Sequence, residues 1–201
     1  MRDVKEPEIR KAEIMDVAGQ LFMEKGYLKT TTQDIIERLN ISRGLLYYHF
    51  KNKEDILYCL VERQTTPLLK QLKQITYNTN YLAIEKTQKF IEATMIKSES
   101  ITEQMVSLQQ SVDLEQNRYV TDRFSHKLVT DVTLFFEHII VQGNEEKVFH
   151  VNHPFETAVF LMTGYVFVSN DIRESSDHEN YLHAFHECLE RVLQSSKPIF
   201  N

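Results

Sequence analysis

The sequence predicts an all-helical protein, and three observations support this fold class. Only nine of the 201 residues are glycine or proline. Apolar residues recur three and four positions apart in most segments, which is the period of an amphipathic helix. Alternation of apolar and polar residues, the pattern of a half-buried strand, is scarce apart from short runs such as VFHV at 148–151.

The composition is that of a globular protein with a sizeable core. Hydrophobic residues make up 42% and charged residues 26%, which argues against a disordered chain. No apolar run approaches the roughly 20 residues that span a bilayer, and the charged N-terminus lacks a secretory signal, so we expect a cytoplasmic protein. The two cysteines, Cys59 and Cys188, form no CxxC pair and cannot build a disulfide framework.

The net charge of −6 is unevenly distributed along the chain. Residues 1–55 carry ten basic and ten acidic side chains, whereas residues 56–201 carry thirteen against nineteen. Only the neutral part could approach a polyanion without repulsion, and then through a local basic surface. We therefore expect two domains with different roles, residues 1–55 and residues 56–201.

Capping residues divide the first domain into three helices. The first runs over about 8–25 and ends at Gly26, and the second begins at Thr31 or Thr32 and ends at Leu39. Asn40 tolerates the left-handed backbone of a tight turn, and Ser42 is a suitable N-cap for a third helix over 43–50. Two helices joined by so short a turn form a helix-turn-helix.

The third helix would expose an unusual face. With Leu46 and Phe50 directed to the core, Gly44 and Tyr48 lie on the opposite side. Glycine allows close backbone approach, Arg43 can pair with guanine, and tyrosine and histidine can donate to phosphates. Lys53 would add a phosphate contact beside free N–H groups at the start of the next helix. The alternative is an ordinary core helix with aromatic side chains on its rim.

Residues 9–57 also resemble the DNA-binding domain of TetR-type (TetR/AcrR) transcriptional regulators. The matching residues are Ile14, Ala18, Leu21, Phe22, Gly26, Tyr27, Thr31, Thr32, Ile35, Asn40, Ile41, Ser42, Leu46, Tyr47, Phe50, Lys53, Glu54, Ile56 and Leu57. Ile36, Leu39 and Asn40 depart from the usual pattern, which has small residues at the first two positions and glycine at the third. The resemblance implies a dimer whose third helices enter successive major grooves, followed by a helical domain that binds an effector.

The resemblance also implies roles for individual residues. Phosphate contacts are expected from Thr32, Tyr47, His49 and Lys53. The groove-facing set is expected to be Gln33, Arg43, Gly44, Leu45 and Tyr48. Ser42 and Lys51 complete the expected DNA-binding residues.

Further helices are expected from about Lys53 onward. Pro67 should interrupt the first of them, as a boundary or as a hinge between the domains, because proline removes a backbone donor. Helical segments then follow at about 82–98, 101–111, 115–142, 154–170 and 179–195.

The last two helices are the expected dimer interface. Residues 153–170 are apolar on nearly every side, so one face would need a partner, whereas residues 179–193 carry a single apolar stripe. The alternative is that both helices close the core of a monomer. The expected interface residues are Val159, Met162, Tyr165, Val166, Phe185, Leu189 and Val192.

An effector site is expected between Ile75 and Gly143. Its apolar lining would include Phe90, Met95, Met105 and Phe135. Gln109, Tyr119, His126 and His138 could orient the ligand. We expect a small apolar or amphipathic molecule, and the acidic second domain weakly favours a cation.

Other functions have less support in the sequence. The histidines at 178, 183 and 186, with Cys188, could bind a metal but lack the spacing of a recognised site. No phosphate-binding loop, HExxH or GxSxG motif occurs, so we expect neither an enzyme nor a cofactor. The sequence thus favours a homodimeric repressor of a palindromic operator that a ligand releases. The alternatives are the same fold with a protein partner in place of the ligand, or a helical metal-binding protein or enzyme.

Overall fold

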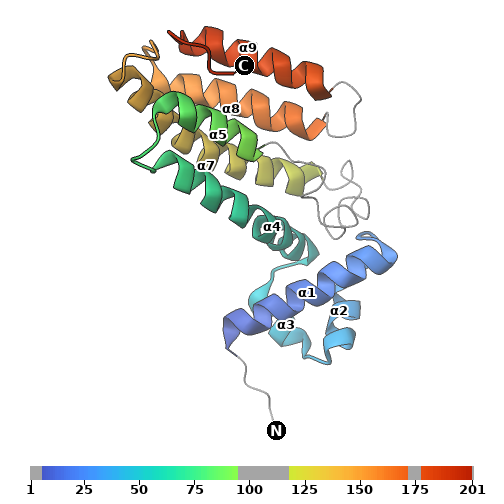
Figure 1. The fold of residues 1–201 in the computed structure, drawn as a ribbon. Helices are drawn as coiled ribbons and strands as arrows, with labels where there is room; N and C mark the ends of the chain where they lie inside the picture. Colours follow the sequence, from blue (N-terminus) through green and yellow to red (C-terminus); the bar gives the residue numbers. More distant parts are fainter. Residues whose placement is uncertain (1–5, 95–117, 172–177, 201) are drawn as a thin grey trace. The chain divides into compact units, whose positions relative to one another are not determined.

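The computed structural model describes residues 6–94, 118–171 and 178–200, and all regular secondary structure in these residues is helical (Figure 1). The all-helical prediction is therefore confirmed, while the helix expected at 101–111 lies outside the described residues. The helices are α1 (Pro7–Lys25), α2 (Thr32–Leu39), α3 (Arg43–His49), α4 (Lys53–Thr76), α5 (Ala83–Thr94), α7 (Arg118–Glu145), α8 (Pro154–Asp171) and α9 (His178–Leu193).

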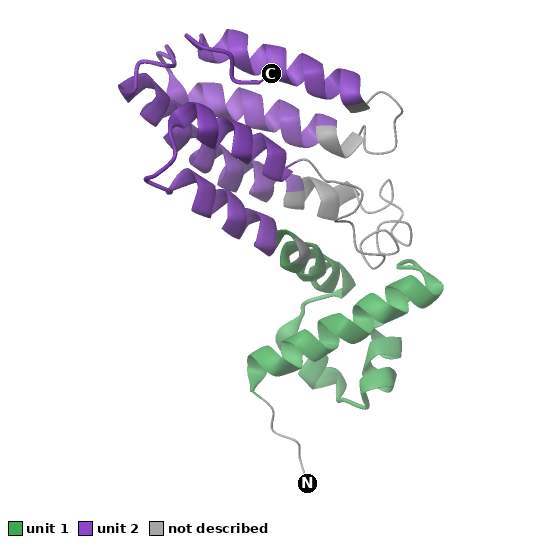
Figure 2. Cartoon of the chain, in the orientation of Figure 1, with its two compact units in different colours: residues 1–65, 97–124 green, residues 66–96, 125–201 purple. Residues whose placement is uncertain are grey.

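The chain divides into two compact units (Figure 2). Unit 1 comprises residues 1–65 and 97–124, and unit 2 comprises residues 66–96 and 125–201. Within the described part of the chain, no helix is both long and apolar enough to cross a membrane.

Unit 1 contains α1, α2, α3 and the first half of α4 around one apolar core. Burial of these side chains supplies the main force that holds the four segments together. The fully buried large side chains of this core are Ile14, Phe22, Ile35, Leu46, Phe50, Ile56 and Leu57. The helical periodicity predicted this inward face of α3, and the burial of Leu46 and Phe50 confirms it.

The turns of unit 1 use the capping residues that the sequence indicated. Gly26 follows α1 with φ 83°, and its N–H donates to the Phe22 carbonyl. Asn40 has φ 50° and ψ 47°, and the next N–H, that of Ile41, donates back to the Ile36 carbonyl at 3.1 Å. This is the left-handed conformation in which glycine usually ends a helix. Asparagine can adopt it as well, so Asn40 forms the same kind of turn that glycine would form.

Helix α4 continues across Pro67, so the predicted interruption is wrong. Proline removes one helical hydrogen bond, but the helix on either side is held by burial. Leu60 packs in the core of unit 1 and Leu72 in the core of unit 2. The helix therefore supplies side chains to both cores.

Unit 2 surrounds a second apolar core with a buried lysine at its edge. Lys86 is 3% exposed, and its ammonium donates to the Thr76 carbonyl at the end of α4 and to Gln142 on α7, both at 2.6 Å. Gln142 donates in turn to the Tyr81 carbonyl and to Glu146. Burial lowers the pKa of Lys86, and this network joins α4, α5 and α7.

Most of the expected dimer-interface residues pack inside unit 2 of the single chain. Met162, Val166 and Leu189 are buried in the core of unit 2. Tyr165 and Phe185 stack on each other at 4.5 Å within the same chain. Of the expected residues, only Val159, which is half-buried, and Val192, which is 40% exposed, retain an outward surface.

The outward surface of α8 and α9 is nevertheless apolar. Phe160 is 81% exposed and Val168 42%, and between them nothing lies within 4 Å of a Cβ built on Gly164. Tyr181 on α9 is also exposed. The apolar stripe of α8 therefore lies at Phe160, Gly164 and Val168 rather than at the expected positions.

We predict that Gly143→Ala destabilises unit 2. A Cβ at Gly143 would lie 1.9 Å from Cδ2 of Phe149, whose ring is buried. Overpacking of this kind costs about 1–3 kcal/mol. Denaturant unfolding of the DNA-free protein would measure the loss.

Gly44→Ala is the control, since nothing lies within 4 Å of a Cβ at that helical position. There alanine should raise the free energy of unfolding by up to about 1 kcal/mol. Equal stability of Gly143→Ala and wild type would contradict the close packing of Phe149.

Candidate nucleic-acid interface

Helix α3 presents a polar and aromatic face to solvent. Tyr48 is 75% exposed, Arg43 is exposed, and the space around Gly44 is open for 4 Å. The opposite side of the helix is anchored by Leu46 and Phe50, which are almost completely buried. The core thus fixes the helix while its outer surface remains available to a flat partner.

A contact between α2 and α3 organises this face. The Thr32 and Tyr47 hydroxyl oxygens lie 3.3 Å apart, and the Arg43 guanidinium lies 5.5 Å from the centre of the Tyr47 ring. Hydrogen bonding to Thr32, with a smaller effect of Arg43, lowers the pKa of Tyr47. The structure therefore brings together three of the expected DNA-binding residues.

Ser42 and His49 lie at the two ends of α3. The Ser42 hydroxyl accepts a hydrogen bond from the Leu45 N–H at 3.2 Å, which makes it the predicted N-cap. His49 is half-buried, and burial lowers its pKa. A neutral imidazole still has an N–H that can donate to a phosphate.

Gln33 and Lys51 are exposed near this face. The Gln33 amide donates to Glu37 on the same helix at 2.8 Å, which orients its side chain. Lys51 is exposed, and no ion pair involves its ammonium within the described residues. Leu45 is half-buried.

Lys11 was not among the residues that the sequence indicated. Its ammonium lies 5.9 Å from the centre of the Phe50 ring, close to the end of α3.

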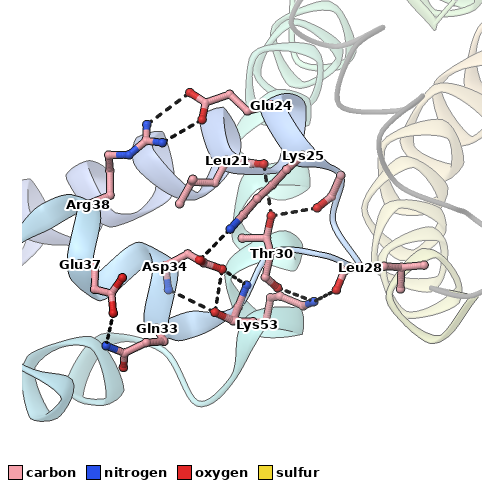
Figure 3. Close-up of polar contacts among 12 residues, drawn as sticks. Leu21, Glu24, Lys25, Leu28, Thr30, Gln33, Asp34, Glu37, Arg38 and Lys53 are labelled. Atoms are coloured by element: carbon pink, nitrogen blue, oxygen red, sulfur yellow. Dashed lines mark hydrogen bonds and ion pairs between the residues drawn. The ribbon is translucent and has the colours of Figure 1, made fainter.

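The Lys53 side chain is directed toward the turn between α1 and α2. Its ammonium donates to the Tyr27 carbonyl at 2.8 Å. It also donates to the Thr30 carbonyl at 2.9 Å, with a longer contact to Leu28 at 3.5 Å (Figure 3). It also lies 4.2 Å from the centre of the Tyr27 ring. The Lys53 ammonium is thus engaged by carbonyl groups of the protein itself, and its expected contact with phosphate stays a prediction.

The start of α4 is partly capped by its own side chains. The Asn52 side chain accepts a hydrogen bond from the Asp55 N–H at 2.8 Å, and Asp55 accepts one from the Lys51 N–H at 3.1 Å. These side chains cap the helix, and the Asp55 carboxylate would repel a phosphate at this point. One of the expected free N–H groups of α4, that of Asp55, is therefore occupied.

A polar network holds the start of α2 against α1 (Figure 3). Thr31 and Asp34 form a reciprocal capping box, and Asp34 also binds the Lys25 ammonium at 2.7 Å. Arg38 pairs with Glu24 through two hydrogen bonds. The Lys25 ammonium and the Thr31 hydrogen bonds lower the pKa of Asp34. A threonine followed three residues later by an acid is a sequence signal for this box that the sequence analysis did not use.

The expected effector residues do not all point inward. Phe90 is completely buried, with its ring 5.5 Å from that of Phe136. Phe135 and His138 instead contact Tyr77, which is itself 51% exposed, and His138 is exposed. His126 is exposed and lies 6.1 Å from the Phe167 ring. Met95, Met105, Gln109 and the side chain of Tyr119 lie outside the described residues.

The histidine cluster on α9 does not assemble as a ligand set. His186 stacks on Phe200 at 3.7 Å, and its Nε2 atom is buried without a partner. Burial lowers its pKa. Nowhere in the described ranges do three or more His, Cys, Asp or Glu side chains converge as metal ligands, and the side chain of His178 is not described.

Part of the chain is similar in sequence to known proteins. The family of bacterial regulatory proteins termed tetR matches residues 14–58. The regulator QacR of Staphylococcus aureus is 39% identical over 72 residues, which are 35% of this chain and 38% of QacR. IcaR of Staphylococcus epidermidis, a negative regulator of the icaADBC biofilm operon, is 50% identical over 52 residues, covering 26% of this chain and 28% of IcaR. The chain thus spans well under half the length of these relatives.

Solved structures share the fold over nearly the whole chain. A TetR-family regulator from Pectobacterium atrosepticum aligns with a TM-score of 0.66 and 22% identity, covering 96% of this chain and 97% of the other. SmeT, the repressor of the Stenotrophomonas maltophilia efflux pump SmeDEF, aligns with a TM-score of 0.63 and 20% identity over 95% and 93% of the two chains. At these identities the likeness concerns the fold.

We predict that Asp34→Asn destabilises unit 1 at neutral pH and that the difference from wild type shrinks in acid. The folded-state pKa of Asp34 is depressed. Its stabilising effect is therefore present above the unfolded pKa of about 4 and is lost as the pH falls through the lower folded value. Thermal unfolding of both proteins over a pH series would measure this. A difference that stayed constant down to strong acid would contradict a role for the carboxylate charge.

Proposed function

We propose that this chain, which belongs to the tetR family of bacterial regulatory proteins through its residues 14–58, is a DNA-binding transcriptional repressor of the cytoplasm. DNA binding would reside in residues 1–55, and effector binding and dimerisation in residues 56–201. The observation that carries the proposal is the exposed face of α3, held rigidly by the buried Leu46 and Phe50.

The composition of this face suits a major groove. Arg43 can donate two hydrogen bonds to guanine, and the absence of a side chain at Gly44 allows the helix backbone to approach the bases. Leu45 and Tyr48 offer apolar surface to thymine methyl groups, and Gln33 at the start of α2 can read an adjacent base. Thr32, Ser42, Tyr47, His49 and Lys51 would hold the phosphates.

Repression of a palindromic operator is supported by the relatives and by symmetry. IcaR is named a negative transcriptional regulator and SmeT a repressor. A homodimer presents two copies of α3 related by a two-fold axis, and such a pair fits two half-sites about one helical turn apart. Repression then follows when the dimer covers a promoter.

Dimerisation would use the exposed apolar stripe of α8 together with the outer face of α9. An apolar side chain as exposed as Phe160, at 81%, gains free energy when a second copy covers it. The open space at Gly164 would accept a side chain from the partner.

Release from DNA would follow when a small apolar or amphipathic ligand binds unit 2. A ligand lowers DNA affinity only if it favours a conformation of the dimer that fits DNA less well. SmeT is by its name the repressor of a multidrug efflux pump, which supports an apolar ligand class for this fold. A gel-shift titration against a panel of hydrophobic cations and neutral drugs would test this.

The proposal predicts different effects of Arg43→Ala and Lys51→Ala on DNA binding. Loss of Arg43 should cost about 1–3 kcal/mol per half-site and relax the preference for one base pair. Loss of Lys51 should weaken binding to all sequences alike and reduce the salt dependence of log K by about 0.9 per subunit. Fluorescence anisotropy at several salt concentrations would measure both, on an operator selected by the wild-type protein from a random duplex pool.

Two results would count against this proposal. Failure of the wild-type protein to enrich any sequence from the pool would remove the regulator function. An Arg43→Ala protein that lost the same affinity on every sequence would show that Arg43 contacts phosphate and reads no base.

A second prediction concerns assembly through Phe160. A glutamate there would be a buried, unpaired charge in a dimer, so Phe160→Glu should yield monomers in sedimentation. DNA affinity should fall with it, because two linked recognition helices bind far better than one. Leu134→Glu is the matched control, since Leu134 is a 50% exposed leucine on α7 and should leave the dimer intact. A dimeric Phe160→Glu protein would exclude this stripe from the interface.

A further inference from the structure

Glu37 is an acidic residue on the side of α2 that carries Gln33. The two residues are four positions apart in this helix, so their side chains lie on the same face. Both are exposed. Because Gln33 is proposed to read a base, the Glu37 carboxylate lies on the side of α2 that is proposed to face DNA. A negative charge in this place weakens the attraction to a polyanion.

The Glu37 carboxylate holds the Gln33 amide. Nε2 of Gln33 donates to Oε1 of Glu37 at 2.8 Å (Figure 3). A carboxylate only accepts hydrogen bonds, so the amide must turn its NH2 group toward Glu37 and its carbonyl oxygen away. The contact therefore selects one of the two orientations that a glutamine amide adopts by rotation about its last torsion angle.

The backbone of Gln33 is fixed separately from its side chain. Thr31 and Asp34 form the capping box at the start of α2, and the Asp34 carboxylate also binds the Lys25 ammonium of α1 at 2.7 Å. The placement of the Gln33 backbone thus depends on the cap and on α1. The direction of its amide depends on Glu37.

An amide of fixed orientation offers one defined pattern to a base edge. With one N–H of Nε2 engaged by Glu37, Gln33 keeps its carbonyl oxygen as an acceptor and its second N–H as a donor. An adjacent acceptor and donor match N6 and N7 of adenine, to which a glutamine can make two hydrogen bonds. A freely rotating amide would lose conformational entropy on binding, whereas the held amide is already ordered.

We propose that Glu37 is a positioning residue that sets the base preference of Gln33, and that its charge weakens binding to sequences that Gln33 does not recognise. This inference rests on the proposed DNA-binding function. Glu37 touches no base in this mechanism and acts through the Gln33 amide and through its own charge. It therefore raises the discrimination between sequences and lowers the total affinity.

Replacement of Glu37 by glutamine separates this role from a structural one. Glu37→Gln keeps the shape of the side chain but can donate as well as accept, so both orientations of the Gln33 amide become possible. Affinity for a mixed-sequence DNA duplex, measured by fluorescence anisotropy, should rise severalfold because one repulsive charge per subunit is removed. A variant that merely damaged the fold would bind every duplex more weakly, and that result would overturn the proposal.

The preference at the base pair that Gln33 reads is the second readout. This base pair is the position of a selected operator at which Gln33→Ala relaxes the preference of the wild-type protein. There Glu37→Gln should lose about fivefold or more of the preference, and it should have no further effect in the Gln33→Ala background. Glu24→Gln is the matched control, since it removes an exposed carboxylate of unit 1 that pairs with Arg38, and it should leave the preference unchanged.

The hydrogen bond itself can be observed in the DNA-free protein. In ¹⁵N-labelled protein, one of the two Nε2 protons of Gln33 should resonate downfield of its position in Glu37→Ala, because it is donated to a carboxylate. Equal resonance positions in the two proteins would show that Glu37 does not hold the amide, which overturns the proposal.

The failures of the two proposals are distinguishable. A wild-type protein that prefers no duplex sequence refutes the DNA-binding function and this inference with it. A wild-type preference at the Gln33 base pair that persists in Glu37→Gln refutes the positioning role alone. A Gln33→Ala protein with the full wild-type preference also refutes it, because Glu37 would then have no base preference to set.

Discussion

Helix α4 contributes side chains to two hydrophobic cores, and the organisation of the chain depends on this constraint. Its first half places Ile56 and Leu57 in the core of unit 1, and its second half places Leu72 and Ile75 in the core of unit 2. Each core resists displacement of its own part of the helix, because moving buried side chains would open cavities. Helix α4 is therefore held at both of its halves by buried side chains.

Pro67 lies inside α4 and does not mark a helix boundary. It neither ends the helix nor separates two helices, since α4 continues to Thr76. It does remove one hydrogen bond at the point where the chain passes from one unit to the other. A helix that lacks one internal bond there bends more easily at that point than elsewhere, while each half remains fixed to its own core.

Two lysines reinforce the ends of the same helix. Lys53, its first residue, donates to the turn before α2, and Lys86 on α5 donates to the carbonyl of Thr76, its last residue. Burial lowers the pKa of both ammonium groups. Desolvating a charge is costly unless acceptors replace the lost water. Both ammonium groups have such acceptors, so they hold the helix ends rather than weaken them.

Much of unit 1 could be predicted from the sequence because its signals are local. The caps at Thr31 and Ser42, the left-handed Asn40 and the inward pair Leu46 and Phe50 follow from short-range rules, and all are present. The Lys53 contacts could not be predicted, because its acceptors lie more than twenty residues earlier in the chain. The sequence does not indicate in which direction a flexible lysine side chain will point.

The sequence does not distinguish the inner face of α8 from its outer face, for a different physical reason. The helix is apolar on nearly every side, so periodicity shows that two faces are buried but not which one meets the core. Met162 and Val166 occupy the core side, and Phe160 and Val168 the outer side. The effector residues raise a similar difficulty, because aromatic and methionine side chains fill cores and line binding sites alike.

The turn at Asn40 also limits how this domain can change over evolutionary time. The direction of α3 relative to α2 depends on one residue with φ 50° and ψ 47°, a conformation that costs most side chains about 1–2 kcal/mol. Glycine and asparagine can exchange there freely, whereas a β-branched residue would strain the turn. Exposed positions of α3 such as Arg43 and Tyr48 can therefore vary without strain in the backbone, while position 40 stays confined to a very small set of amino acids.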